Sequence, residues 1–105
     1  MNLKVDYSRK YTKDQASQIK SVLSSPDKWC KGPFALDADG ESCGYDSEDA
    51  VKFCIGATLL KLRLPLVPLN ILAVKRGYPS IIFLNDDPKT TFESTMELIN
   101  EATEE

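Results

Sequence analysis

Apolar and polar positions along this 105-residue chain follow short, separate patterns joined by turn-forming residues. The first pattern is an alternation near the amino terminus, where Leu3, Val5 and Tyr7 are separated by Lys4 and Asp6. A period of two residues is typical of a strand with one buried face. We therefore predict a short strand at the start of the chain.

A helix is predicted next, beginning after Thr12. Thr12 and Gln15 have the spacing of a capping box, in which each side chain binds the backbone N–H of the other residue. The apolar residues that follow fall on one helix face: Ala16, Ile19, Val22 and Leu23. Residues 24–26, Ser-Ser-Pro, are expected to end this helix.

A second, central helix is predicted after Ser47, because Glu48 and Asp49 would complement the helix dipole in its first turn. Its apolar stripe comprises Ala50, Phe53, Cys54, Ala57 and Leu60. Gly56 interrupts this helix at a cost of up to about 1 kcal/mol, so another backbone or a ring, such as Trp29, is expected to pack closely against it.

Pro65 and Pro68 are expected to end the central helix. Residues 69–77 then predict a short buried helix with a basic last turn and Gly77 as its C-cap. The apolar run over residues 80–84 fits either a strand or one more helical turn, and its periodicity does not decide between them.

The last predicted helix begins at a second capping box formed by Thr90 and Glu93. One apolar face follows, made by Phe92, Met96, Ile99 and Ala102. We expect the tail over residues 103–105 to fray. Together these patterns predict one globular domain over residues 1–105, with its core in about 10–102. The fold class is mainly α, with about four helices and room for a short β-hairpin or two-stranded element.

A long segment with turn chemistry, residues 27–46, separates the first two predicted helices. Its large apolar residues are Trp29, Phe34 and Leu36. Asp39-Gly40 predicts a two-residue hairpin turn inside an acidic loop over residues 33–47. The stretch from 37 to 49 contains no Lys or Arg.

Composition narrows the functional classes. With 42% hydrophobic and 28% charged residues, the chain resembles a soluble globular protein. Its net charge of −3 argues against direct nucleic-acid binding, which needs a surplus of Lys and Arg. The sequence lacks an apolar run long enough for a membrane span and begins without the apolar core of a signal peptide, so we expect a cytoplasmic protein.

The chain has no histidine and three cysteines, Cys30, Cys43 and Cys54. The missing imidazole excludes Ser-His and Cys-His nucleophile pairs and histidine-ligated zinc. No cofactor is predicted. Cys54 is expected to be a buried, unreactive thiol on the central helix, whereas Cys30 and Cys43, both in the loop, are the candidates for a reactive cysteine.

The acidic loop has part of the spacing of a calcium-binding loop. Counted from Asp37, carboxylates fall at positions 1, 3, 5 and 12, which are Asp37, Asp39, Glu41 and Glu48. Such loops need glycine at position 6, but Ser42 stands there. A hairpin tip that is acidic on its solvent side, or a docking surface for a basic partner, fits the pattern better.

Four islands of sequence resemble an uncharacterised bacterial and phage family, domain of unknown function 6197. They are Trp29-Cys30-Lys31-Gly32, Asp37-x-Asp39-Gly40, Asp49-Ala50-x-x-Phe53-Cys54-Ile55-Gly56-Ala57, and Asn85-Asp86 followed by Thr90 and an acidic amphipathic helix. The resemblance spans residues 16–102 and implies a small, mostly helical domain. It implies no activity, cofactor or catalytic residue. Lys89 stands where the family commonly has arginine, and the linker over residues 65–68 departs from the family pattern.

Two islands have both a structural and a functional interpretation. Trp29 and Cys30 are expected to anchor the loop to the central helix. Asn85 and Asp86 are expected to fix a local turn by binding nearby backbone. If both instead point toward Trp29 and Asp37, the islands would form a polar pocket for a small, nucleotide-like ligand.

Three functions remain open. The first is a non-catalytic binding protein that captures a host protein, such as a phage-encoded inhibitor of a host defence system, for example an anti-CRISPR. The second is a small-ligand sequestering protein, and the third is a small hydrolase or transferase that uses Asp carboxylates. We rank the first ahead. The candidate binding residues are Trp29, Asp37, Asp39, Glu41, Asp46, Glu48, Asn85 and Asp86.

Overall fold

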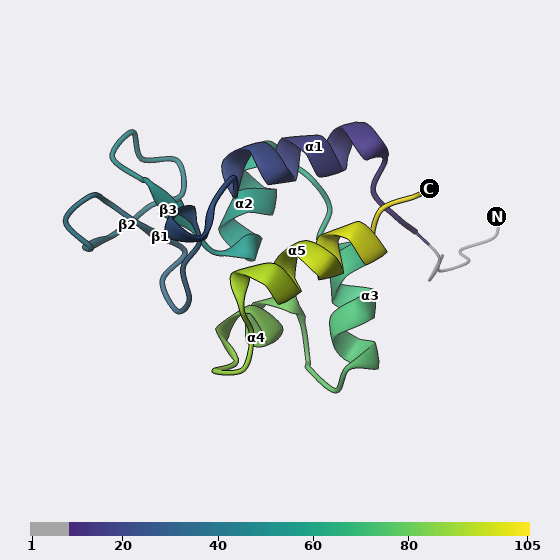
Figure 1. Cartoon of the computed structure of the whole chain (residues 1–105). Helices are drawn as coiled ribbons and strands as arrows, with labels where there is room; N and C mark the ends of the chain where they lie inside the picture. The colour runs from purple at the N-terminus through teal and green to yellow at the C-terminus, as the bar shows by residue number, and fades with distance from the viewer. Residues whose placement is uncertain (1–8) are drawn as a thin grey trace, which may run out of the picture.

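Residues 9–105 form five α-helices and a small antiparallel sheet in a computed structural model (Figure 1). The helices are α1 (Lys13–Val22), α2 (Ile55–Leu62), α3 (Val67–Lys75), α4 (Ile81–Asp86) and α5 (Phe92–Glu101). The strands are β1 (Ala35–Leu36), β2 (Ser42–Cys43) and β3 (Lys52–Phe53), and a 3₁₀ turn, η1, covers Pro26–Lys28. The prediction of a mainly helical domain with a short β element is confirmed. The strand predicted from Leu3, Val5 and Tyr7 lies outside the described residues.

The first helix follows the sequence closely because its start is fixed locally. The Thr12 hydroxyl accepts a hydrogen bond from the Gln15 N–H at 3.1 Å, and the Gln15 side chain accepts one from the Thr12 N–H at 3.0 Å. Ala16 and Ile19 are buried, as is Leu23 directly after the helix. The predicted capping box and buried face are confirmed.

The predicted hairpin is present but belongs to a three-stranded sheet with the order β2-β1-β3. Ala35 lies opposite both Cys43 and Phe53. The connection between β1 and β2 runs from Asp37 to Glu41, so the predicted two-residue turn at Asp39-Gly40 is wrong. The Asp37 Oδ1 accepts the N–H groups of Asp39 and Glu41, each at 2.9 Å, and this arrangement favours the longer turn.

The prediction that the central helix begins after Ser47 is wrong. Lys52 and Phe53 pair with β1 as strand β3, and α2 begins only after Cys54, whose sulfur accepts the Ala57 N–H at 3.3 Å. Ser47 instead closes a short turn, in which its hydroxyl accepts the Asp49 N–H at 3.2 Å. Phe53 and Cys54 are buried as expected, but from a strand and a cap rather than from a helix face.

A close approach at Gly56 is present as predicted, but the partner is the aliphatic side chain of Ile82 rather than a backbone or a ring such as Trp29. A Cβ atom on Gly56 would lie 2.3 Å from the Cδ1 atom of Ile82, a residue of α4. The glycine therefore lets α2 and α4 pack closely.

The remaining helices confirm most of the sequence pattern. Helix α3 is followed by Gly77 at φ +91°, and the apolar run over residues 80–84 belongs to a helix, α4. The capping box of α5 is shifted by one residue from the prediction, because Thr91 and Ser94 form it. Thr90 is buried, and its hydroxyl donates to the Leu84 carbonyl at 2.6 Å.

Tyr11 joins the two ends of the described chain. Its ring is fully buried, its hydroxyl donates to the Pro65 carbonyl at 2.6 Å, and burial raises the pKa of this phenol. Its backbone N–H donates to the Ala102 carbonyl, and its carbonyl accepts the Glu104 N–H at 2.9 Å. Thr103 pairs with Tyr11 as well, and the fraying expected for residues 103–105 stays a prediction.

Candidate binding surfaces

Asn85 is the centre of a polar junction between the loop, α2 and α4. Its side chain is only 1% exposed. The amide oxygen accepts the Trp29 Nε1–H at 2.9 Å and the Ile55 N–H at 3.0 Å. The amide nitrogen donates to the Cys30 carbonyl at 3.2 Å and to the Asp86 carboxylate at 3.0 Å. All four hydrogen-bonding positions of the amide are therefore occupied.

Further contacts tie the loop to α4. The Gly32 N–H donates to the Asp86 Oδ1 at 2.9 Å. The Lys31 ammonium lies 5.6 Å from the centre of the Trp29 ring and donates to the Asp87 carbonyl at 2.8 Å. These contacts hold the segment before β1 against the helices.

The junction brings together part of the predicted site. Asn85 and Asp86 both point toward the loop that carries Trp29, as the pocket hypothesis required. Asp37 is absent from this hydrogen-bond network, because its Oδ1 is engaged in the hairpin turn. Since the Asn85 amide has no capacity left for a ligand, the geometry favours the anchoring interpretation. The Trp29 indole is anchored to Asn85 of α4, and the same amide oxygen binds the Ile55 N–H at the start of α2.

The other predicted site residues lie in the acidic lobe, which we define as residues 37–49 and which carries β2 between two turns. Five acidic residues of the lobe are exposed: Asp39, Glu41, Asp46, Glu48 and Asp49. Asp37 is half-buried. The salt bridge between Arg76 and Glu101 is the only one within residues 9–105. The carboxylates of the lobe therefore face solvent without a cation from the described chain.

The acidic side chains do not converge on a point. Across the part of the chain that the structure describes, no group of three or more His, Cys, Asp or Glu side chains is placed to hold a metal ion. The geometry favours a surface rather than a chelating site.

Two apolar side chains flank the acidic lobe in the sequence. Phe34 is 49% exposed just before β1, and Val51 is 45% exposed just before β3. The backbone holds both firmly, because the Phe34 carbonyl accepts the Cys54 N–H at 2.9 Å and the Val51 N–H donates to the Leu36 carbonyl at 2.8 Å. An exposed apolar side chain thus lies on the chain just outside each end of the lobe.

No protein-family model, curated protein or solved structure matches this chain. The resemblance to domain of unknown function 6197 stays a prediction. A separate finding is that none of the helices within residues 9–105 is long and apolar enough to cross a membrane.

The structure also shows a surface that the sequence reasoning missed. Helix α3 was predicted as a buried helix, and its inner residues Leu69, Leu72 and Ala73 are indeed buried. Its outer residues Val67 and Val74 are 39% and 59% exposed. The available signal was that α3 is apolar around its whole circumference, which leaves an apolar face outward when only one side is covered.

The three thiols differ in their access to solvent, because Cys30 and Cys54 are buried and Cys43 is half-buried. Burial raises the pKa of Cys30 to about 11, and burial also raises the pKa of Cys54. The pKa of Cys43 is raised by desolvation and by the nearby Asp37 and Asp49 carboxylates. The thiolate is the nucleophile, and a raised pKa leaves little thiolate at neutral pH. The structure therefore argues against Cys30 as a reactive cysteine.

Alkylation of the native protein with iodoacetamide at pH 8 is expected to modify Cys43 first, because it is the only one of the three cysteines that is not buried. Cys30 and Cys54 should react at least about tenfold more slowly, as buried thiols with little thiolate do. Intact mass and peptide mapping over time would measure the order. Modification of Cys30 before Cys43 would contradict this description of the loop.

Proposed function

We propose that this protein is a non-catalytic binding protein that docks onto a basic surface of another protein through its acidic lobe. The observation that carries the proposal is the set of exposed carboxylates at Asp39, Glu41, Asp46, Glu48 and Asp49, none of which pairs with a cation within residues 9–105. Opposite charges across an interface steer association and fix its orientation.

The anchoring of the lobe supports this proposal. Loops that are held in one conformation lose less conformational entropy on binding. The junction at Asn85 and the pairing of β1 with β2 and β3 fix the lobe on the helices. Phe34, which is exposed just before β1, supplies an aromatic contact of the kind that protein interfaces favour over charged groups alone.

Charge reversal tests the proposal. We compare the variant Asp39→Lys/Glu41→Lys/Glu48→Lys with a control, Glu93→Lys/Glu97→Lys/Glu105→Lys, which changes three exposed acids outside the lobe and shifts the net charge equally. Immobilised wild type and control are expected to capture the same protein from a bacterial lysate, identified by mass spectrometry, and the lobe variant should lose it.

Two outcomes would count against the proposal. Equal loss in both variants would show a non-specific effect of net charge, and equal capture by both would remove the acidic lobe from recognition. The finer prediction, a phage-encoded inhibitor of a host defence system such as an anti-CRISPR, rests on the family resemblance alone. The identity of the captured protein would test it.

A further inference from the structure

The outer face of α3 is an apolar surface without a covering element in the described chain. Val67 and Val74 are exposed, and Ile71 is half-buried between them. These positions follow the spacing i, i+4 and i+7, so they form one stripe about 10 Å long at 1.5 Å per residue. Asn70, the polar residue beside the stripe, is engaged elsewhere, because its side-chain oxygen accepts the Ile81 N–H at 2.9 Å.

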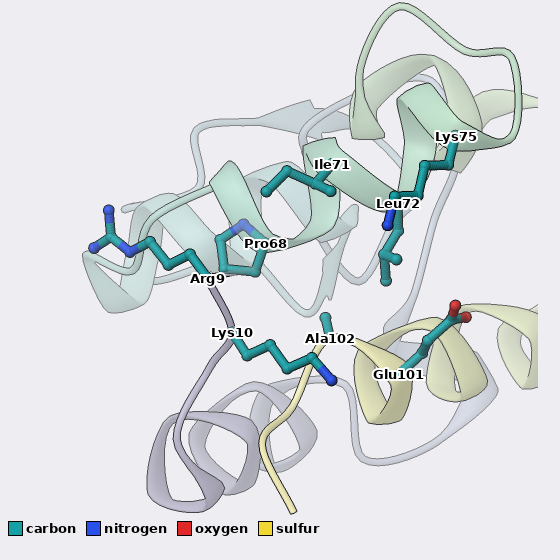
Figure 2. A pocket seen from close by; sticks show the side chains of 8 residues that line it. All are labelled: Arg9, Lys10, Pro68, Ile71, Leu72, Lys75, Glu101 and Ala102. Atoms are coloured by element: carbon teal, nitrogen blue, oxygen red, sulfur yellow. The ribbon is translucent and has the colours of Figure 1, made fainter. Parts of the chain in front are cut away.

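Two adjoining hollows make this stripe a groove. One hollow, of about 330 Å³, is lined by Val67, Asn70, Ile71, Val74 and Lys75. The other, of about 380 Å³, lies between α3, the chain before α1 and the end of α5 (Figure 2). Its floor includes Pro68, Ile71, Leu72 and Ala102. Because Ile71 and Lys75 line both hollows, the two form one surface, which we call the α3 groove.

The rim of the α3 groove is basic. Arg9, Lys10 and Lys75 line it, and none of them forms an ion pair within residues 9–105. The acid on the rim, Glu101, is paired with Arg76 at 2.6 Å. The groove therefore has an apolar floor and a positive edge, whereas the acidic lobe lies at the opposite end of the molecule (Figure 1).

We propose that the α3 groove docks an amphipathic helix of a partner protein that carries apolar residues on one face and carboxylates beside them. Such helices bind hydrophobic grooves through anchors at i, i+4 and i+7, the spacing that the stripe itself presents. The three rim cations select an acidic helix over a basic one. This inference goes beyond the proposed function, because it concerns a second surface with the opposite charge.

Other occupants fit the charges less well. Two copies of this chain meeting through their α3 grooves would bring their basic rims together, and like charges across an interface are unfavourable. A membrane with anionic lipids would attract the rim, but the net charge of −3 and the acidic lobe oppose adsorption of the whole chain. The helix of a partner protein contacts only the groove and its basic rim, so the acidic lobe at the other end of the molecule opposes it less than it opposes an extended anionic surface.

A displayed library of random 16-residue peptides, selected on the wild type and counter-selected on Val74→Glu, tests the proposal directly. Enriched peptides are expected to have apolar residues at i, i+4 and i+7 and an excess of Asp and Glu. A fluorescent copy of the best peptide should bind Val74→Glu and Lys75→Glu at least about tenfold more weakly than wild type, as measured by anisotropy. Val51→Glu is the matched control, because it places the same charge on another exposed valine, just before β3 and away from the groove, and it should bind like wild type.

Several results would overturn this inference. They are a lack of enrichment, enrichment of basic or non-helical patterns, and equal weakening by Val51→Glu. Sedimentation of wild type as a dimer that Val74→Glu dissociates would assign the groove to a second copy. Pelleting with phosphatidylglycerol vesicles that depends on Val74 would assign it to a membrane. Circular dichroism would confirm that each variant is folded.

Discussion

Replacing Asn85 with alanine is expected to lower the free energy of unfolding by about 3–4 kcal/mol, because a buried polar group without a partner costs about 1–3 kcal/mol. The substitution would leave the Trp29 Nε1–H, the Ile55 N–H and the Cys30 carbonyl without their shared partner. Urea denaturation followed by far-UV circular dichroism measures the change.

Asn100→Ala is the matched control for that substitution. Asn100 is an exposed asparagine of α5 that accepts a hydrogen bond from Lys20, and its loss should change stability by no more than about 0.5 kcal/mol. A double-mutant cycle between Asn85→Ala and Trp29→Phe should give a coupling of about 1 kcal/mol. Equal effects of Asn85→Ala and Asn100→Ala would contradict the role of Asn85 as the anchor of the loop.

Tyr11→Ala is expected to destabilise the protein by about 4 kcal/mol, because truncation of a buried aromatic ring leaves a cavity. The loss has a second part, since the Pro65 carbonyl loses its hydrogen bond from the Tyr11 hydroxyl. Tyr11→Phe removes only this second part and should cost about 1 kcal/mol. Urea denaturation of both variants separates ring burial from the hydrogen bond. An alanine variant no less stable than the phenylalanine variant would show that the ring does not hold the chain ends together.

The sequence predicted well the elements whose boundaries are set by near neighbours. The start of α1 depends on Thr12 and Gln15, and both partners lie within one helical turn. The end of α3 is likewise a local feature, although the C-cap is Arg76 and the predicted cap Gly77 follows it at φ +91°. At the start of α5, both Thr90 and Thr91 could serve as the cap. Thr91 is the cap, because the Thr90 hydroxyl donates instead to the Leu84 carbonyl, six residues earlier in the chain.

The errors fell where distant partners decide the structure. Phe53 fits a helical stripe by spacing, but pairing with Ala35 places it in a strand. In the candidate site, too, partners far away in the sequence set the structure. Asn85 could be expected to bind local backbone, yet three of its partners, including Trp29 and Ile55, lie 30 or more residues away. The acidic lobe, in contrast, could be predicted because a stretch without Lys or Arg is visible in the sequence.

We propose that the acidic lobe recognises a basic protein, and titration of the captured protein tests this claim most directly. Calorimetry would compare wild type, Asp39→Lys/Glu41→Lys/Glu48→Lys and the charge-matched control Glu93→Lys/Glu97→Lys/Glu105→Lys. Reversal of three interfacial charges at about 1 kcal/mol each predicts an affinity at least about 100-fold weaker for the lobe variant. The control should bind within about threefold of wild type. An unchanged affinity in the lobe variant, or an equal loss in the control, would contradict the claim.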